Sequence, residues 1–244
     1  MNSKCIRRTT AARAFRFTLP ALPWLLWLTM GSPAVRAADA TNPLVRAVAP
    51  GKFQIGQVNL DKTNRTISFP AAVNMREADL PVEYAVVQQR GKTHESIFRT
   101  EARPHDIQVA LLLLGAQPAM TNSFGASGKE VPIGERLTIE VAWTNDGRAV
   151  HCAMEDLVTN KETGQTMTRG EWIFNGSNFS EGVFNAERDG SIVSIHIDPG
   201  ALINNPRPGR ENDDLHVPNP AKLPPAGHPV EVRFKLHVGP KQDR

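Results

Sequence analysis

Two stretches with the same alternation, RLTIEVAW at residues 136–143 and VEVRFKLHV at residues 230–238, decide the fold class. In both, every second residue is apolar, and the residues between are polar, charged or small. Successive side chains of a β-strand point to opposite faces of a sheet, so this pattern predicts strands with one face in a core and the other in water. The chain is therefore expected to be rich in half-buried β-strands.

Seven further segments have weaker strand patterns, and short turn sequences separate them. Asp followed by Gly is typical of a tight turn and occurs in NDG at 145–147 and RDG at 188–190, with KETG at 161–164 as a third turn. The further strand candidates are FQIGQVNL at 53–60, RTISFP at 65–70, VEYAVVQ at 82–88, HESIFRT at 94–100, AVHCAME at 149–155, EWIFNG at 171–176 and SIVSIHI at 191–197.

One segment, RPHDIQVALLLLGA at residues 103–116, predicts a prominent buried helix over about 104–115. Pro104 costs no hydrogen bond in a first turn, Asp106 there suits the helix dipole, and Gly115 is a typical C-terminal cap. A buried strand is the alternative, since a run of leucines does not show a period. The predicted fold class is α+β and β-rich, with a mostly antiparallel sheet or sandwich and this one helix.

Residues 1–37 have the three-part layout of a cleaved signal peptide. Five basic residues without an acid precede the apolar run LPALPWLLWLTM, and VRA ends at Ala37 with small residues at the two positions that a signal peptidase reads. A membrane anchor is the alternative, but the run is short and contains Pro20 and Pro23. We expect an exported protein, periplasmic or extracellular, without a stable membrane span after cleavage.

The rest of the chain reads as one domain. Residues 38–43 are expected to be a short linker, 44–239 a single β-rich domain and 240–244 a tail. Within the domain, residues 199–229 are dense in Pro, Gly and Asn, and a strong strand follows them. This segment is therefore expected to be an ordered loop over the surface.

Charge argues against nucleic acid as a partner. The whole chain has 28 basic and 25 acidic residues, but six of the basic residues and none of the acids lie in residues 1–37. Cleavage leaves 22 basic against 25 acidic residues, a net charge of −3. The concentrated positive field that nucleic-acid binding needs is therefore missing.

His94 and Glu95, in GKTHESIF at residues 91–98, are the first candidates for chemistry. A zinc-protease helix needs a second histidine one turn after the first, but Phe98 stands there, so that motif fails. If the turn exposes both side chains, they could converge with His105 and Asp106 at the helix start and hold a divalent metal or do acid–base work. The alternative is a polar corner between strand and helix. Whether a metal binds stays open.

EWIFNGSNF at residues 171–179 is the second candidate site. Trp172 beside the polar Asn175 and Ser177 could form a platform for a sugar or peptide, and the alternative is an aromatic core strand that ends in a turn. Cys152, left without a partner once Cys5 leaves with the signal peptide, is expected to be an inert core residue.

With these segments described, the chain resembles the YdjY-domain family of bacterial exported proteins. The resemblance rests on residues 73–98, 110–116, 155–179 and 189–206, and it extends over nearly all of 44–238. It implies export in a bacterium and brings no established activity. Some relatives carry a cysteine-rich segment interpreted as an iron–sulfur module, which a chain with one mature cysteine does not share.

No complete catalytic motif, cofactor fingerprint or metal-ligand spacing is present in the sequence. We therefore expect a cell-envelope protein that acts as a non-catalytic ligand-binding or assembly module, with no cofactor and with an unknown ligand or envelope protein as its partner. The alternative is a metal-assisted or acid–base enzyme of hydrolase type that uses His94, Glu95, His105 and Asp106.

The signal-peptide interpretation predicts cleavage after Ala37. N-terminal sequencing of the exported protein should then begin at Ala38, because the small residues of VRA lie directly before that bond. A mature product that still contains Trp24 and Trp27 would contradict this interpretation and favour the membrane anchor.

Overall fold

The computed structural model of the chain describes residues 44–119, 124–125, 127 and 129–237. The expected signal peptide, the linker over 38–43 and the tail over 240–244 lie outside the described residues, so these remain predictions. Within the part that the structure describes, no helix is both long and apolar enough to cross a membrane.

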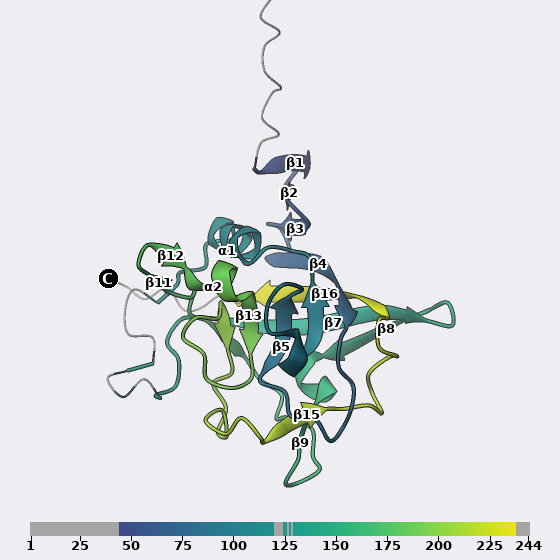
Figure 1. The fold of residues 1–244 in the computed structure, drawn as a ribbon. Coiled ribbons are helices and arrows are strands. Elements are labelled where there is room, and N and C mark those ends of the chain that lie inside the picture. The colour runs from purple at the N-terminus through teal and green to yellow at the C-terminus, as the bar shows by residue number, and fades with distance from the viewer. Residues whose placement is uncertain (1–43, 120–123, 126, 128, 238–244) are drawn as a thin grey trace, which may run out of the picture. The chain divides into compact units, whose positions relative to one another are not determined.

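The main sheet closes on itself as an eight-stranded barrel, which corrects the predicted sheet or sandwich (Figure 1). The prediction of a β-rich chain is confirmed, but the barrel is closed by a pairing between β4 and β6 that no single-strand pattern indicates. In spatial order the barrel strands are β4 (Thr66–Val73), β16 (Pro229–Leu236), β7 (Glu135–Asn145), β10 (Trp172–Phe174), β14 (Ile203–Asn204), β13 (Ser191–Ser194), β5 (Tyr84–Gln88) and β6 (Ser96–Thr100).

The pairings of the barrel are mostly antiparallel, as predicted. Two pairs, β5 with β6 and β13 with β14, are parallel. The two strands that the sequence shows most clearly lie side by side, because Val232 pairs with Val141 and Phe234 with Ile139.

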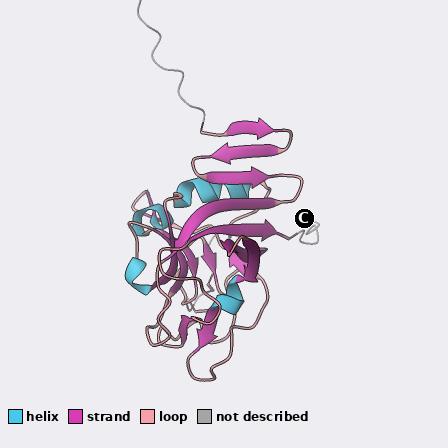
Figure 2. Cartoon of the chain, turned by 90° about the vertical axis from the view of Figure 1, so that its right-hand side faces the viewer, coloured by secondary structure: helices cyan, strands magenta, loops and turns pink. Residues whose placement is uncertain are grey.

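A ribbon of three strands continues the sheet beyond β4 (Figure 2). It consists of β1 (Arg46–Ala49), β2 (Lys52–Ile55) and β3 (Val58–Asp61). The segment 53–60, predicted as one strand, is a hairpin instead, because Gly56 takes a φ of +54° in the turn between β2 and β3. A glycine in this left-handed conformation reverses the chain at little steric cost.

A second hairpin extends the sheet from β7. Strand β8 (Arg148–Ala153) pairs with β7, and the NDG turn joins them with positive φ at both Asp146 and Gly147. Two left-handed residues in a row match the twist of the strands that they connect, which is why this sequence makes a tight hairpin.

Helix α1 (Pro104–Leu113) confirms the predicted helix and its proline start. One side of the helix, including Ile107 and Leu111, is buried against β2, β3 and β4, whereas Leu112 and Leu113 are exposed. The helix is therefore buried on one side only, less completely than the apolar run suggested.

The remaining elements are short. They are the 3₁₀ turns η1 (Thr93–Glu95) and η2 (Met154–Leu157), the helix α2 (Asn185–Asp189), and the strands β9 (Val158–Asn160), β11 (Phe179–Ser180), β12 (Val183–Phe184) and β15 (His216–Pro218). Residues 199–229 contain β14 and β15, and β15 pairs with β9.

The interior of the barrel is the hydrophobic core. Alternate residues of the long strands point inward, and the rings of Phe69 and Phe234 meet edge to face with centroids 5.3 Å apart. Since β4 and β16 bury one face each, the other face of both strands is left to water and polar residues.

Cys152 lies on β8 opposite Val141, the pairing that the NDG turn predicts. Its side chain is half-buried and packs against the edge of the core, whereas a fully buried core residue was predicted. Burial, with a smaller effect of Asp156, raises the pKa of the Cys152 thiol.

We predict that Cys152 reacts slowly with a thiol reagent in the folded protein and quickly after denaturation, because the thiolate is disfavoured in the fold. Cys152→Ala should lower the free energy of unfolding by about 1 kcal/mol through a small cavity. Stopped-flow labelling and denaturant titration measure the two effects. Native labelling as fast as that of the denatured chain would show a reactive site instead.

Candidate functional site

His94 and Glu95 lie in η1, the turn between the parallel strands β5 and β6. The His94 side chain is 80% exposed, and its Nε2 lies 3.7 Å from a carboxylate oxygen of Glu95. The backbone carbonyl of Glu95 accepts a hydrogen bond from the amide of Glu83, which holds the turn against the start of β5.

Buried partners fix this corner. The Lys92 ammonium donates to the hydroxyl of the buried Tyr84, and that hydroxyl donates to Asp198 at 2.8 Å. Burial, followed by the charge of Asp198, raises the pKa of Tyr84, so this phenol stays protonated. The Asn74 amide donates to the carbonyl of Ser96 at 2.8 Å. The arrangement is that of a rigid polar corner.

The structure does not bring the four predicted residues together. His105 and Asp106 pair at the start of α1, 3.5 Å apart, whereas His94 and Glu95 precede β6 at its opposite end. In the described ranges, no group of three or more His, Cys, Asp or Glu side chains could hold a metal ion. The metal or acid–base cluster therefore has no assembled geometry here.

Trp172, Asn175 and Ser177 bind the chain's own groups. Trp172 is fully buried on β10, and its indole nitrogen donates to a carboxylate oxygen of Glu155 at 3.0 Å. The Asn175 amide and the Ser177 hydroxyl donate to two successive backbone carbonyls in residues 200–201. Trp172 thus offers no open face to a ligand, and its position is that of a residue in an aromatic core strand.

A buried ion pair supports this region. Arg207 donates to the same carboxylate oxygen of Glu155 at 2.5 Å, and its guanidinium lies over the ring of Trp172, 5.0 Å from the centroid. Burial, followed by the charge of Arg207, lowers the pKa of His216 to about 4. Removing either partner of the pair would leave an uncompensated buried charge, so the pair fixes the loops around it.

A hollow of pocket size lies elsewhere, on the outer face of the barrel. We call it the front groove: its floor is the outward face of β4, β16 and β7, and its wall is the ribbon β1–β3. Figure 2 looks onto this sheet, with α1 behind it. The volume of the hollow is about 710 Å³, within the range of ~300–1,000 Å³ usual for ligand pockets.

Two cross-strand rows of polar side chains make up the floor. Residues directly opposite on neighbouring strands share one face of a sheet, so each row is continuous. The lysine row consists of Lys52, Asp61, Thr66, Lys235 and Thr138. The arginine row, two residues further along the strands, consists of Asn59, Ser68, Arg233 and Glu140.

The acids of the groove already have basic partners. Asp61 lies 3.6 Å from Lys52, and Glu140 lies 3.2 Å from Arg233. Lys235 differs, because it makes no ion pair with any residue that the structure describes. The groove therefore carries one uncompensated positive charge on its floor.

Hydroxyl groups surround that charge. Thr66 and Thr138 are the cross-strand neighbours of Lys235 on either side. The hydroxyls of Thr66 and Ser68 make no hydrogen bond within the described part of the chain, so both can donate to or accept from a ligand. Most ligand pockets are largely apolar, and this one instead fits a polar ligand.

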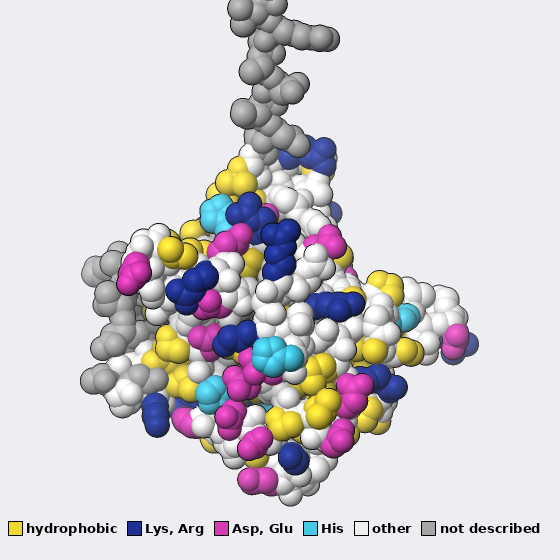
Figure 3. Space-filling view, viewed as in Figure 1, with side chains coloured by type: hydrophobic (Ala, Val, Ile, Leu, Met, Phe, Trp, Pro, Cys, Tyr) yellow, Lys and Arg dark blue, Asp and Glu magenta, His cyan; other side chains and the backbone are white. Residues whose placement is uncertain are grey.

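Sequence reasoning missed this site. Most lining residues are polar members of the strands, which were interpreted only as the solvent face, and Val48, Phe53 and Leu60 complete the lining. A signal was present, since the polar face of β4 carries hydroxyls and that of β16 carries charges. Only the order in which these strands pair shows that their polar side chains form continuous rows. Figure 3, which views another face, shows basic and acidic side chains mixed there.

Comparison with known proteins gives a match to a family profile that covers most of the described chain. The family profile described as YdjY domain matches residues 58–235. No curated protein and no solved structure matches the chain significantly.

The buried His216 predicts a loss of stability in mild acid. Because its pKa is lowered to about 4 in the fold against 6.5 in the unfolded chain, the unfolded state binds the extra proton between these values. The free energy of unfolding is therefore unaffected by His216 protonation above pH 6.5. As the pH drops towards 4, protonation of the unfolded chain lowers the free energy of unfolding by roughly 3 kcal/mol. Urea titrations of the wild type and of His216→Gln across this range measure it. Identical pH slopes in the two proteins would show that His216 is not responsible.

Proposed function

This chain belongs to the YdjY domain family, and we propose that it is a non-catalytic binding module of the bacterial cell envelope. Its ligand is an extended, hydroxyl-rich and negatively charged molecule, of which an acidic polysaccharide is the chemical type. The signal-peptide layout of residues 1–37 supports export to the envelope as part of this proposal.

The proposal rests on one observation: Lys235 has no ion-pair partner among the described residues and lies between the hydroxyl-bearing Thr66 and Thr138. An ammonium without a carboxylate partner attracts an anion, and the free hydroxyls of Thr66 beside it and of Ser68 in the next row can bind neighbouring oxygen atoms of the same ligand. The two rows continue this chemistry across three barrel strands, which suits a chain of sugar units rather than a single small ion.

The ion pairs of the groove contribute to selectivity. Arg233 is held between Glu140 and Glu231, at 3.2 and 2.6 Å, so it presents a fixed guanidinium. A carboxylate-bearing sugar unit can approach Lys235, while the ion-paired Arg233 and Glu140 can exchange hydrogen bonds with the hydroxyls of a neighbouring unit. A neutral sugar lacks the carboxylate that pairs with Lys235, so the groove favours the acidic sugar.

We predict that a hexamer of galacturonate binds the purified protein and that a neutral malto-hexaose binds much more weakly. Lys235→Gln should weaken galacturonate binding about ten-fold, or ~1.4 kcal/mol, because a charge-assisted contact is lost. Isothermal titration calorimetry measures both. Affinity should also fall with added salt, since the groove is open to water.

Lys161→Gln is the matched control. Lys161 is an exposed lysine of the turn after β9, outside the groove, and its loss should leave the affinity unchanged. Equal binding of the neutral sugar, or equal affinity of Lys235→Gln and the wild type, would refute the proposed ligand class.

A further inference from the structure

A second hollow lies where the parallel strands β5 and β6 end. Their carboxyl ends meet at one edge, and α1 begins at Pro104, a short turn after the end of β6. Ligands of sheets with parallel strands commonly bind at this edge. The hollow, which we call the α1 cleft, has a volume of about 380 Å³, near the lower end of the range for small-molecule sites.

Two turns, one at Gly91 and one at Gly190, pack closely against each other beside the α1 cleft. A Cβ atom at Gly91 would lie 2.6 Å from the carbonyl oxygen of Asp189, and one at Gly190 would lie 2.8 Å from the Cα of Gly91. Gly190 also has a φ of +70°, and its carbonyl accepts the amide of Gln88 at 2.8 Å. The turn with Arg90 is therefore fixed against the turn that follows α2.

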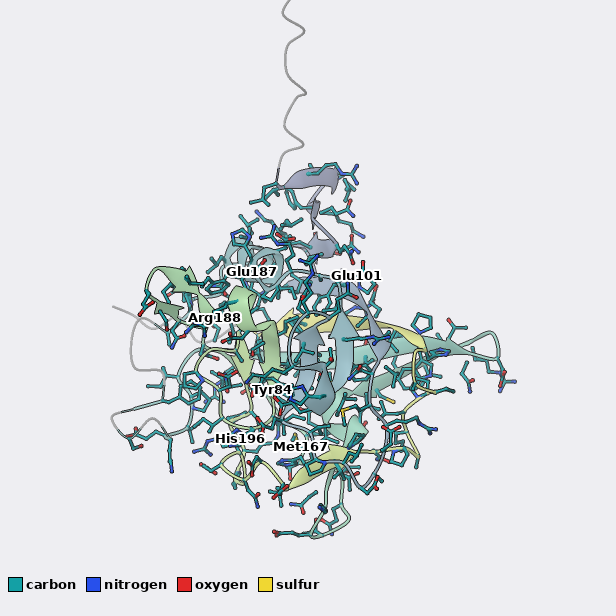
Figure 4. The ribbon with its side chains drawn as sticks, in the orientation of Figure 1. Tyr84, Glu101, Met167, Glu187, Arg188 and His196 are labelled. Atoms are coloured by element: carbon teal, nitrogen blue, oxygen red, sulfur yellow. The ribbon has the colours of Figure 1, made fainter. Side chains whose placement is uncertain are left out.

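Two arginines of the cleft are already neutralised. Arg103 donates to Glu187 at 2.8 Å, and the second oxygen of Glu187 accepts the backbone amide of His105. Arg188 makes two hydrogen bonds to Asp189, both at 2.7 Å. In Figure 4, Glu187 and Arg188 lie on one side of this region and Glu101 on the other.

Two opposite charges of the cleft remain without an ionic partner. The guanidinium of Arg90 has no partner among the residues that the structure describes. Glu101 accepts only a 3.3 Å hydrogen bond from Gln57 and makes no ion pair within the same part of the chain. They follow neighbouring strands, since Gln88 pairs with Thr100, yet they are not within ion-pair distance of each other.

We propose that the α1 cleft binds a free α-amino acid. Arg90 takes the carboxylate, because its planar donors match that group, and Glu101 takes the ammonium. The side-chain amides of Gln57, Gln88 and Gln89 line the same hollow and can bind remaining polar atoms. A zwitterion satisfies both unpaired charges at once, whereas a simple anion would leave Glu101 without an ionic partner.

The test is a titration of the purified full chain with each of the twenty proteinogenic L-amino acids, followed by calorimetry on those that raise the melting temperature. At least one should bind at millimolar concentration or below. Arg90→Gln and Glu101→Gln should each weaken its binding at least ten-fold. Propionate and ethylamine, each with one of the two charges, should bind at least ten-fold more weakly than the amino acid.

Matched controls separate the cleft from the rest of the surface. Arg148→Gln, at an exposed arginine beside the β7–β8 turn, and Lys235→Gln, in the front groove, should leave amino-acid binding unchanged. No binding by any of the twenty, equal binding of propionate, or unchanged affinity in Arg90→Gln would overturn the proposal. None of these results bears on galacturonate binding in the groove.

Discussion

The pairing of Ala72 and Val73 on β4 with Arg99 and Phe98 on β6 closes the barrel, and the rest of the structure depends on this closure. One edge of β4 is shared, because its first half pairs with β3 and its last residues pair with β6. Pro70 lies between the two pairings and has no amide hydrogen to offer, while its carbonyl accepts the Thr100 hydroxyl at 2.6 Å. Strand β4 thus changes its partner from β3 to β6 at Pro70, a residue that cannot donate a backbone hydrogen bond to either strand.

Both candidate sites follow from this closure. Because β3 is displaced from the barrel by β6, the ribbon β1–β3 stands beside the outer face of the sheet and makes the wall of the front groove. Because β6 runs parallel to β5, their ends meet under the start of α1 and make the α1 cleft. The charged and hydrogen-bonding groups of both sites lie on polar strand faces and in turns, although Leu60 of the core also lines the front groove. The buried Glu155–Arg207 pair and the Tyr84–Asp198 hydrogen bond instead hold loops and turns in place.

Local features of the fold were predictable from the sequence, and long-range ones were not. The alternation of β7 and β16, the NDG hairpin and the proline start of α1 are each set by neighbouring residues, and all three are present. Barrel closure depends on which distant edges pair, and a period-two pattern is the same in a sandwich and in a barrel. The same limit explains the sites. His94 and His105 are near in sequence but flank β6, whereas Thr66, Lys235 and Thr138 are far apart in sequence and adjacent in the sheet.

The proposed ligand-binding surface is the outer face of β4, β16 and β7. The most direct measurement is backbone-amide NMR mapping during titration with galacturonate hexamer. If ligand binds there, the amides of Thr66–Ser68, Arg233–Lys235 and Thr138 will shift together and saturate at one affinity, while those of α1 and η1 stay unchanged. Saturable shifts confined to α1, η1 or the α1 cleft, with the three barrel strands unaffected, would contradict it.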